Sequence, residues 1–355
     1  MPKPRASVSR RRMLGYFAFA VAVCWGAYSY FFQTRIIPIS NWGLSTNNEG
    51  VSVQKGSEEE GKDAYGLNAQ PSLAGMTRLM DLSPKYIPET GKHRHGGRLI
   101  VVGDVHGMKE SLVALLDKVK FNEKRDHLIL AGDMISKGPD SKGVVDLAMK
   151  LGATGIRGNH EDRIILAHAD MEAEHRDTGL PGPTEPMDKQ QDTLEEESFN
   201  HGDYKDRRLV KQLGEKRIKW LKKCPVILRV GDLGDMGEVV VVHAGLTPGV
   251  SLHKQDPVQV MNMRTIKHGV PSDKREGTVW TKEWNKYQKS VPKKHRQTVI
   301  YGHDSKRGLQ MKKYSMGIDT GCLKGGKLTA VVIEGGHSDH KYTLHHVKCK
   351  DGRDR

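Results

Sequence analysis

The chain has 355 residues, with 57 Lys and Arg against 43 Asp and Glu, so its formal net charge is +14. Hydrophobic residues make up 36%, enough for one large catalytic domain with extensions and too many for a disordered chain. The four cysteines show no CxxC or zinc-finger spacing, which excludes a disulfide framework and a structural zinc module; they are Cys24, Cys224, Cys322 and Cys349.

Residues 13–32 form an uncharged run that predicts a membrane anchor. At about 1.5 Å per residue, a helix of this length spans a hydrocarbon core of about 30 Å. A cleaved signal peptide and a buried core helix are the alternatives, but the length of the run and its aromatic end favour an uncleaved anchor. Five cations and no acid precede it, so the positive-inside rule predicts a type II protein with residues 1–12 as a basic cytosolic arm.

The remaining chain divides by composition. Residues 33–95 are rich in Gly, Ser, Asn and Glu and indicate a flexible stalk. Residues 96–348 predict the catalytic domain, interrupted at 172–208 by a polar insertion with three prolines, and residues 349–355 form a tail.

Apolar runs in the predicted domain alternate with helical patterns. Runs at 99–102 and 128–131 are followed by helical patterns at 108–120 and 144–151, as in a βαβ layout with its chemistry at the strand ends. Further strands are predicted at 226–230, 239–242, 299–301 and 328–333, so the second half is β-rich and the fold class is α/β.

Five short fragments, each placed after an apolar run, carry the residues for chemistry. They read GDVHG, GDMISKGPDS, RGNHED, VVHAG and YGHD, and contain Asp104, His106, Asp133, Asn159, His160, His243 and His303. Each fragment alone is more typical of a turn or a structural histidine. All five together, in the same position relative to a strand, indicate one site.

The residue types suit two divalent metal ions. Two ions about 3.5 to 4 Å apart need oxygen and imidazole ligands and a carboxylate that bridges them. Asp104 and His106 point to the same side of an extended strand end and would hold one ion, with Asp133 as the bridge. Asn159, His243 and His303 would complete the second. A hydroxide between the ions would attack phosphorus in line, and His160 would protonate the leaving oxygen.

The order of these motifs resembles the calcineurin-like metallophosphoesterase superfamily, in its phosphoprotein phosphatase branch, over roughly residues 98–346. The resemblance implies a β-sandwich flanked by helices with a dinuclear site. It also implies that the six Asp, His and Asn residues above are metal ligands and that His160 is the catalytic acid. Zinc, manganese, cobalt and iron all suit these ligands, and the resemblance favours zinc.

One sequence difference sets the chain apart from the protein phosphatases of this branch. Ser136-Lys137 stands where the protein phosphatases have Asp-Arg, so the carboxylate that orients the catalytic histidine is missing. The membrane-anchored chain with its SKGP sequence is similar to the zinc-dependent endopolyphosphatases of fungal vacuoles. The IDTGC stretch after residue 317 is closer to diadenosine tetraphosphatase-like members, and Asp319 within it is interpreted as a turn residue or a support for a ligand.

The charge distribution is compatible with a polyanionic substrate. Residues 201–313 hold 25 Lys and Arg against 11 Asp and Glu, densest at 216–223 and 289–296. Such a surface attracts polyphosphate by electrostatic steering, although a generally basic or lipid-binding surface explains it equally well. Lys137, Arg157 and Arg264 are the cations expected nearest the scissile phosphate.

The sequence therefore predicts an endopolyphosphatase that cleaves internal phosphoanhydride bonds of inorganic polyphosphate. It would be anchored in the vacuolar membrane, or another endomembrane, with its catalytic domain in the lumen. The alternatives are a membrane-tethered Ser/Thr protein phosphatase, a diadenosine tetraphosphate hydrolase, and a metal-binding scaffold, which would be expected to have lost ligands. No nucleic-acid partner is predicted, and the sequence does not fix the oligomeric state.

Overall fold

The computed structural model describes residues 75–91, 97–178 and 204–352. The predicted cytosolic arm, the predicted anchor and most of the predicted stalk lie outside these residues. Among the described residues, no helix has both the length and the apolar character needed to cross a bilayer.

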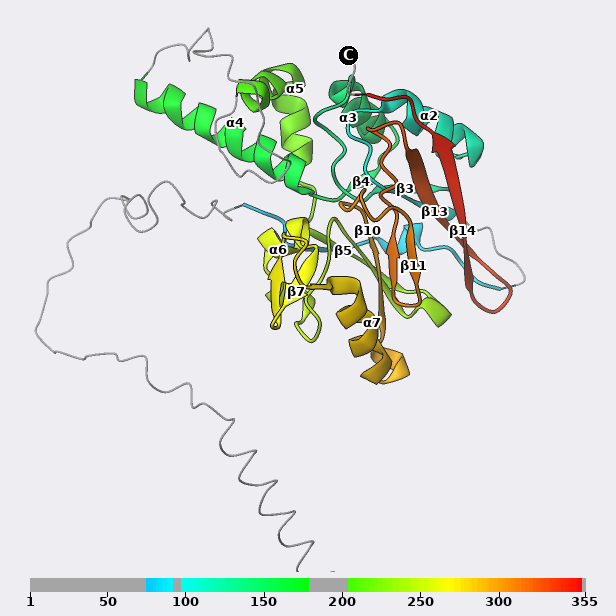
Figure 1. Ribbon diagram of the computed structural model, residues 1–355. Helices are drawn as coiled ribbons and strands as arrows, with labels where there is room; N and C mark the ends of the chain where they lie inside the picture. The colour runs from blue at the N-terminus through cyan, green and yellow to red at the C-terminus, as the bar shows by residue number, and fades with distance from the viewer. Residues whose placement is uncertain (1–74, 92–96, 179–203, 353–355) are drawn as a thin grey trace, which may run out of the picture. The chain divides into compact units, whose positions relative to one another are not determined.

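The first sheet contains the predicted βαβ units (Figure 1). Its strand order is β14-β13-β2-β3-β4. Strands β2, β3 and β4 are parallel and are connected by helices α2 and α3, whereas β13 and β14 are antiparallel additions at one side. The bounds are β2 Arg98–Val102, α2 Lys109–Lys118, β3 His127–Leu130, α3 Ser141–Lys150, β4 Thr154–Gly155, β13 Lys327–Gly335 and β14 His340–Lys348.

The second sheet has the order β1-β5-β6-β10-β12-β11, in which β6, β10 and β12 run parallel. Its strands are β1 Leu79–Asp81, β5 Ile227–Asp232, β6 Glu238–Val242, β10 Gln297–Tyr301, β11 Gln310–Lys312 and β12 Ser315–Gly317. A small third sheet of order β8-β7-β9 consists of β7 Thr265–Lys267, β8 Val270–Ser272 and β9 Thr278–Val279.

The two large sheets pack face to face because their strands are apolar on both sides. Successive side chains of a strand point to opposite faces. Leu99 and Val101 of β2 therefore lie in the core between the sheets, while Ile100 and Val102 pack on the other side with residues of α2 and α3. All four are fully buried, which explains why the run is continuous rather than alternating in the sequence.

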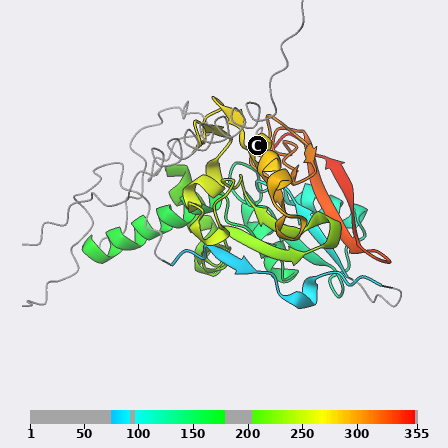
Figure 2. The ribbon, with the colours of Figure 1, turned by 90° about the horizontal axis from the view of Figure 1, so that it is seen from below.

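Helices cover the outer faces of the sandwich. Helices α2 and α3 cover the first sheet, while α6 (Pro257–Asn262) and α7 (Trp280–Ser290) cover the second through a cluster that includes Trp280 and Trp284. Helices α4 (Asn159–Thr178) and α5 (Tyr204–Lys222) pack against each other and extend away from the sheets (Figure 2). The described residues also contain four 3-10 helices: η2 Pro84–Tyr86, η3 Gly234–Met236, η4 Leu252–Lys254 and η5 Lys293–His295.

Two of the predicted boundaries differ from the structure. Residues 79–81, placed in the stalk, form strand β1, which pairs in parallel with β5. The predicted insertion at 172–208 is helical at both ends, because α4 continues to Thr178 and α5 starts at Tyr204. Both helix ends are polar and rich in Glu, Lys and Arg, and these residues have high helix propensity without forming an apolar pattern.

The cysteine spacing predicts no disulfide framework, and the structure adds a single disulfide that the spacing does not indicate. Cys322 and Cys349 form one disulfide, and Cys224 is a buried free thiol. The two bridged cysteines are 27 positions apart in the sequence and are brought together because β13 and β14 form a hairpin between them. The start of the predicted tail, residues 349–352, is therefore part of the folded domain.

Candidate active site

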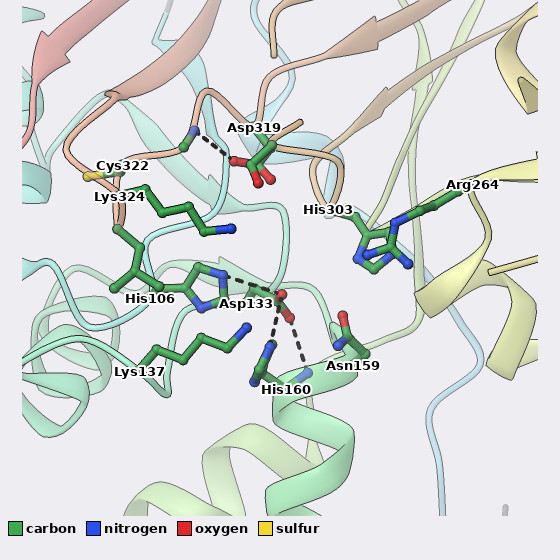
Figure 3. Close-up of a pocket in the computed structure, with 13 residues that line it drawn as sticks. His106, Asp133, Lys137, Asn159, His160, Arg264, His303, Asp319, Cys322 and Lys324 are labelled. Carbon is green, nitrogen blue, oxygen red and sulfur yellow. Dashed lines mark hydrogen bonds and ion pairs between the residues drawn. The ribbon is translucent and has the colours of Figure 1, made fainter. Parts of the chain in front are cut away.

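The predicted site residues meet at the ends of five strands. Asp104 and His106 follow β2, Asp133 follows β3, Asn159 and His160 begin α4 after β4, His243 follows β6 and His303 follows β10. The carboxyl ends of parallel strands lie at one edge of a sheet, so both sheets contribute to the same place. The pocket there is lined by residues that include His106, Asp133, Asn159, His160 and His303 (Figure 3).

His243 and His303 are held with one ring nitrogen on a backbone carbonyl and the other facing inward. Nδ1 of His243 lies 3.0 Å from the carbonyl oxygen of Ala131, and Nε2 of His303 lies 3.0 Å from that of Asn262. A carbonyl only accepts, so each of these nitrogens carries a proton and each neutral ring presents a lone pair at its other nitrogen. Those two nitrogens are 3.2 Å apart, an arrangement that fits a shared cation.

His106 and Asp133 extend the same pattern. Nδ1 of His106 is 3.3 Å from the carbonyl oxygen of Ile135, while its Nε2 is 3.7 Å from Oδ2 of Asp133. Nε2 of His243 is 3.3 Å from the same oxygen. Asp133 therefore lies between a histidine on one side and a histidine pair on the other, as a bridging ligand must.

The protonation equilibria also match a metal site. Burial lowers the pKa of His106 to about 4, although the Asp133 carboxylate opposes the shift. Burial disfavours the charged form of Asp133, but its histidine neighbours outweigh this effect and hold its pKa well below the usual value. Burial opposes protonation of His243 as well, yet the charge of Asp133 raises its pKa to about 10. The pocket thus attracts positive charge, which a divalent ion supplies when it displaces that proton.

Asp104 contacts the backbone of one of these ligands, His303. Its carboxylate accepts hydrogen bonds from the backbone N–H of His303, at 3.0 and 3.1 Å. Among the described residues, three clusters have potential ligand atoms within 4.8 Å of one another, and Asp104 belongs to none of them; they are His106–Asp133–His160 and Asp133–His243–His303 in the pocket, and His168–Glu172–Glu215 on α4 and α5. Its ligand role stays a prediction.

Asp319 contacts Asp104, as its interpretation as a supporting residue suggested. Burial raises the pKa of Asp319 to about 6, and Asp104, also buried, has a pKa raised well above its usual value. The backbone N–H of Gly321 donates to Asp319 at 3.0 Å. Two buried carboxyl groups in contact add to the demand for a cation at this end of the pocket.

His160 lies beside Asp133, but among the described residues no carboxylate contacts the Nδ1 atom of its ring. Its Nε2 lies 3.9 Å from Oδ2 of Asp133, and its backbone N–H donates to Oδ1 of that residue at 3.1 Å. Burial holds its pKa well below the usual value, and its Nδ1 is buried without a hydrogen-bond partner in the described part of the chain. The ring instead packs edge-on against His106, with centroids 5.0 Å apart. The orienting carboxylate missing from the sequence is thus not replaced by another residue in the structure.

Glu161 is a functional candidate that the sequence analysis missed. It is fully buried and its carboxylate accepts from four backbone N–H groups, at 2.8 to 3.3 Å; the donors are Asp133, Met134, Ile135 and Gly158. These contacts fasten the loop of Asp133 to the loop before Asn159. The position of Glu161 directly after Asn159-His160 in the GNHED motif could have identified it from the sequence.

The loops of the site have an unusual backbone. Of the seven non-glycine residues with positive φ in the described ranges, five are in the site loops: His106, Asp133, Ser136, Lys137 and His303. Such conformations cost about 1–3 kcal/mol each and gather at functional sites. Two motif glycines are explained by close contact: a Cβ at Gly132, where φ is +94°, would lie 2.6 Å from Nδ1 of His243, and one at Gly302 would lie 2.0 Å from Oδ1 of Asp104.

The predicted substrate cations are placed differently from one another. Lys137 and Arg264 line the pocket, on opposite sides of Asp133 (Figure 3). Arg157 does not line it: its guanidinium forms a buried ion pair with Asp162 at 2.6 Å, so its predicted contact with substrate is wrong. A third lining cation, Lys324, was not predicted.

The comparison with known proteins decides the family. The model of the calcineurin-like phosphoesterase family matches residues 97–338. The chain belongs to the calcineurin-like phosphoesterase family. The zinc-dependent endopolyphosphatase of Saccharomyces cerevisiae is 27% identical over 70% of this chain and 80% of its own length.

Other calcineurin-like phosphoesterases resemble the chain nearly as well. The symmetrical bis(5'-nucleosyl)-tetraphosphatase of Nitrosospira multiformis is 26% identical over 66% of this chain and 92% of its own length. Some further enzymes of that name match over only about half of their length. A crystal structure described as that of a candidate diadenosine tetraphosphatase superposes with a TM-score of 0.56 at 26% identity, covering 78% of this chain and all of the other.

The two basic stretches do not surround the pocket of this calcineurin-like phosphoesterase together. Residues 216–223 lie on and just after α5, and residues 289–296 run from the end of α7 through η5. Figure 1 shows α5 and α7 at opposite ends of the domain. These two stretches therefore do not form a single continuous basic track.

Proposed function

We propose that this calcineurin-like phosphoesterase is an endopolyphosphatase, a hydrolase of internal phosphoanhydride bonds in inorganic polyphosphate. The observation that carries the proposal is the gathering of cationic side chains on both sides of Asp133, with Lys137 on the His106 side and Arg264 on the His303 side. A phosphate chain has charge on both sides of the bond that is cut, whereas the ester group of a monoester has none. The similarity to the yeast endopolyphosphatase supports the same choice.

The residues of the chain have distinct tasks in this proposal. Asp104, His106 and Asp133 would hold one divalent ion, and Asp133, Asn159, His243 and His303 would hold the other. When bound, the two ions polarise the phosphoryl oxygens and lower the pKa of water. His160 lines the same pocket, with its Nε2 3.9 Å from Oδ2 of Asp133, and would protonate the leaving oxygen, while Lys137 and Arg264 would hold the phosphates on either side.

A dinucleoside tetraphosphatase is the second candidate, favoured by the bacterial relatives and by the superposed crystal structure. It shares the anhydride chemistry and differs in recognising a nucleoside. The protein phosphatase alternative is less well supported, because Ser136 and Lys137 replace the Asp-Arg pair of that branch.

The prediction of a luminal catalytic domain gains support from the Cys322–Cys349 disulfide. Disulfides persist in oxidising compartments and are rare in the cytosol. We keep the type II anchor at residues 13–32 and the vacuolar membrane as parts of the proposal. Protease protection of the domain in sealed vesicles would test the topology, and digestion without detergent would reject it.

The test of the function uses the full chain, freed of metal and supplied separately with Zn²⁺, Mn²⁺, Co²⁺ or Mg²⁺. Long-chain polyphosphate is incubated with each form and product lengths are read on a gel. Shortening to intermediate chains, dependent on metal, supports an endopolyphosphatase. Release of orthophosphate alone, or intact polymer beside cleaved diadenosine tetraphosphate or phosphopeptide, rejects it and selects the alternative.

A further inference from the structure

The loop of residues 320–326 contributes an unassigned cation to the pocket. Lys324 lines the pocket together with Gly321, Cys322 and Leu323. Its side chain extends from the loop toward the space above Asp133, from the same side as Lys137 and opposite Arg264 (Figure 3). The pocket therefore has two lysines on its His106 side and one arginine on its His303 side.

Hydrogen bonds and a buried side chain give this loop a defined shape. The backbone N–H groups of Lys324 and Gly326 donate to the carbonyl of Gly321, at 3.1 and 2.9 Å, and that of Gly325 donates to Cys322 at 3.0 Å. Gly321 and Gly325 have φ of 71° and 73°, values that glycine adopts without strain. Leu323 is buried in the core while Lys324 is exposed, so the turn keeps the lysine side chain out of the core.

The loop is also fastened to the end of β14. The Cys322–Cys349 disulfide lies two residues before Lys324, and both sulfurs are buried in the core shared with α2. On the other side, the backbone N–H of Gly352 donates to the carbonyl of Leu323 at 2.9 Å, and Cys349 donates to Gly326 at 3.0 Å. These contacts restrict where Lys324 can reach.

We propose that Lys324 binds a phosphate next to the scissile one, and that the Cys322–Cys349 disulfide positions it for this contact. The proposal rests on the proposed function only in needing a substrate with several linked phosphates. A substrate with one phosphate would be bound by the metal ions and offers Lys324 no neighbouring phosphate. The ammonium group of Lys324 adds affinity only when a further charged group follows, so it selects for phosphate chains.

The test measures tripolyphosphate as a competitive inhibitor of p-nitrophenyl phosphate hydrolysis. Lys324→Ala is compared with Lys327→Ala, which removes an exposed lysine three residues away that does not line the pocket. We expect Lys324→Ala to raise the inhibition constant of tripolyphosphate about 10-fold or more, as a charge-assisted hydrogen bond is lost. The inhibition constant of orthophosphate, and the KM for p-nitrophenyl phosphate, should rise by a clearly smaller factor than the inhibition constant of tripolyphosphate. Chelation of metal by tripolyphosphate affects both variants alike.

Several results would overturn the role of Lys324. These are an unchanged inhibition constant, an equal loss for orthophosphate, and an equal loss in Lys327→Ala. None depends on whether polyphosphate is cleaved, so failure of the proposed function is seen separately, as an intact polymer with the wild-type protein.

The positioning role of the disulfide is tested by non-additivity. Cys322→Ser/Cys349→Ser should raise the inhibition constant of tripolyphosphate by a larger factor than that of orthophosphate. Adding Lys324→Ala to this variant should then have less effect than in the wild type. A full additional loss, or no change in the double serine variant, rejects the coupling. If that variant does not fold, the same constants are measured on wild-type and Lys324→Ala protein after reduction with dithiothreitol.

Discussion

The floor and the rim of the pocket are built by different means. The floor consists of side chains directly after buried strands, held by hydrogen bonds to the backbone, as His243 is held by Ala131 and His303 by Asn262. The rim consists of cations on three separate loops, Lys137, Arg264 and Lys324. In the proposed function, the floor carries the hydrolytic chemistry, whereas the rim would determine which phosphates are bound. Substitutions in the two regions should therefore affect different kinetic constants.

The largest effect is expected at the centre of the floor. Asp133→Asn removes the charge that lies between the histidines, so metal affinity should collapse and kcat should fall by about 10³-fold or more, since several kcal/mol of charge stabilisation are lost. Metal content by atomic emission and kcat together check it. Asp117→Asn, at an exposed position of α2, is the control and should behave as wild type. Retained metal and activity would remove Asp133 from the bridge.

His160→Ala should separate chemistry from metal binding. We expect kcat to fall roughly 10²- to 10⁴-fold, the usual contribution of a general acid, with both metals retained. His253→Ala, at an exposed site, is the matched control. Because His160 also lies in a cluster with His106 and Asp133, loss of one metal equivalent in His160→Ala would instead make it a ligand.

Arg157 and Arg264 were both predicted to contact substrate, but their replacement by alanine should affect different quantities. Arg264→Ala should raise KM for a phosphate-chain substrate roughly 10- to 100-fold. Arg157→Ala leaves Asp162 buried without its ion-pair partner, so it should lower the free energy of unfolding by about 3–5 kcal/mol and affect KM much less. Steady-state kinetics and urea unfolding of both variants check this difference. A raised KM with unchanged stability in Arg157→Ala would restore it to the rim.

The smallest effect is expected at an ion pair that belongs to neither region. Burial opposes ionisation of Asp126, but hydrogen bonds and the charge of Arg98 outweigh this and lower its pKa. A lowered pKa in the folded state stabilises the protein above the unfolded value of about 3.9, and this contribution is lost as the pH falls through the folded value. Asp126→Asn should therefore lower Tm near neutral pH and converge with the wild type below about pH 3. A constant difference in Tm across this range would contradict the assignment.

The difference between the floor and the rim also explains which features could be predicted from the sequence. Strands such as Arg98–Val102 were foreseen because both faces are buried and the apolar run is continuous, and the ligands were found because they follow these strands in short motifs. Strand β1, α5 and Lys324 were missed because their positions depend on long-range contacts: β1 on pairing with β5, and the loop of Lys324 on a disulfide across a hairpin. Arg157 was assigned to substrate because its neighbour Asp162 was not recognised as its partner.

The left-handed backbone conformations in the floor and the neighbouring loop affect the stability of the protein before it binds metal. Five non-glycine residues in strained conformations, at about 1–3 kcal/mol each, together cost about as much as the 5–15 kcal/mol by which a domain is usually stable. Freshly made protein without metal would therefore be the state most exposed to quality control. Its abundance in the cell would follow metal supply, even when its rate of synthesis does not change.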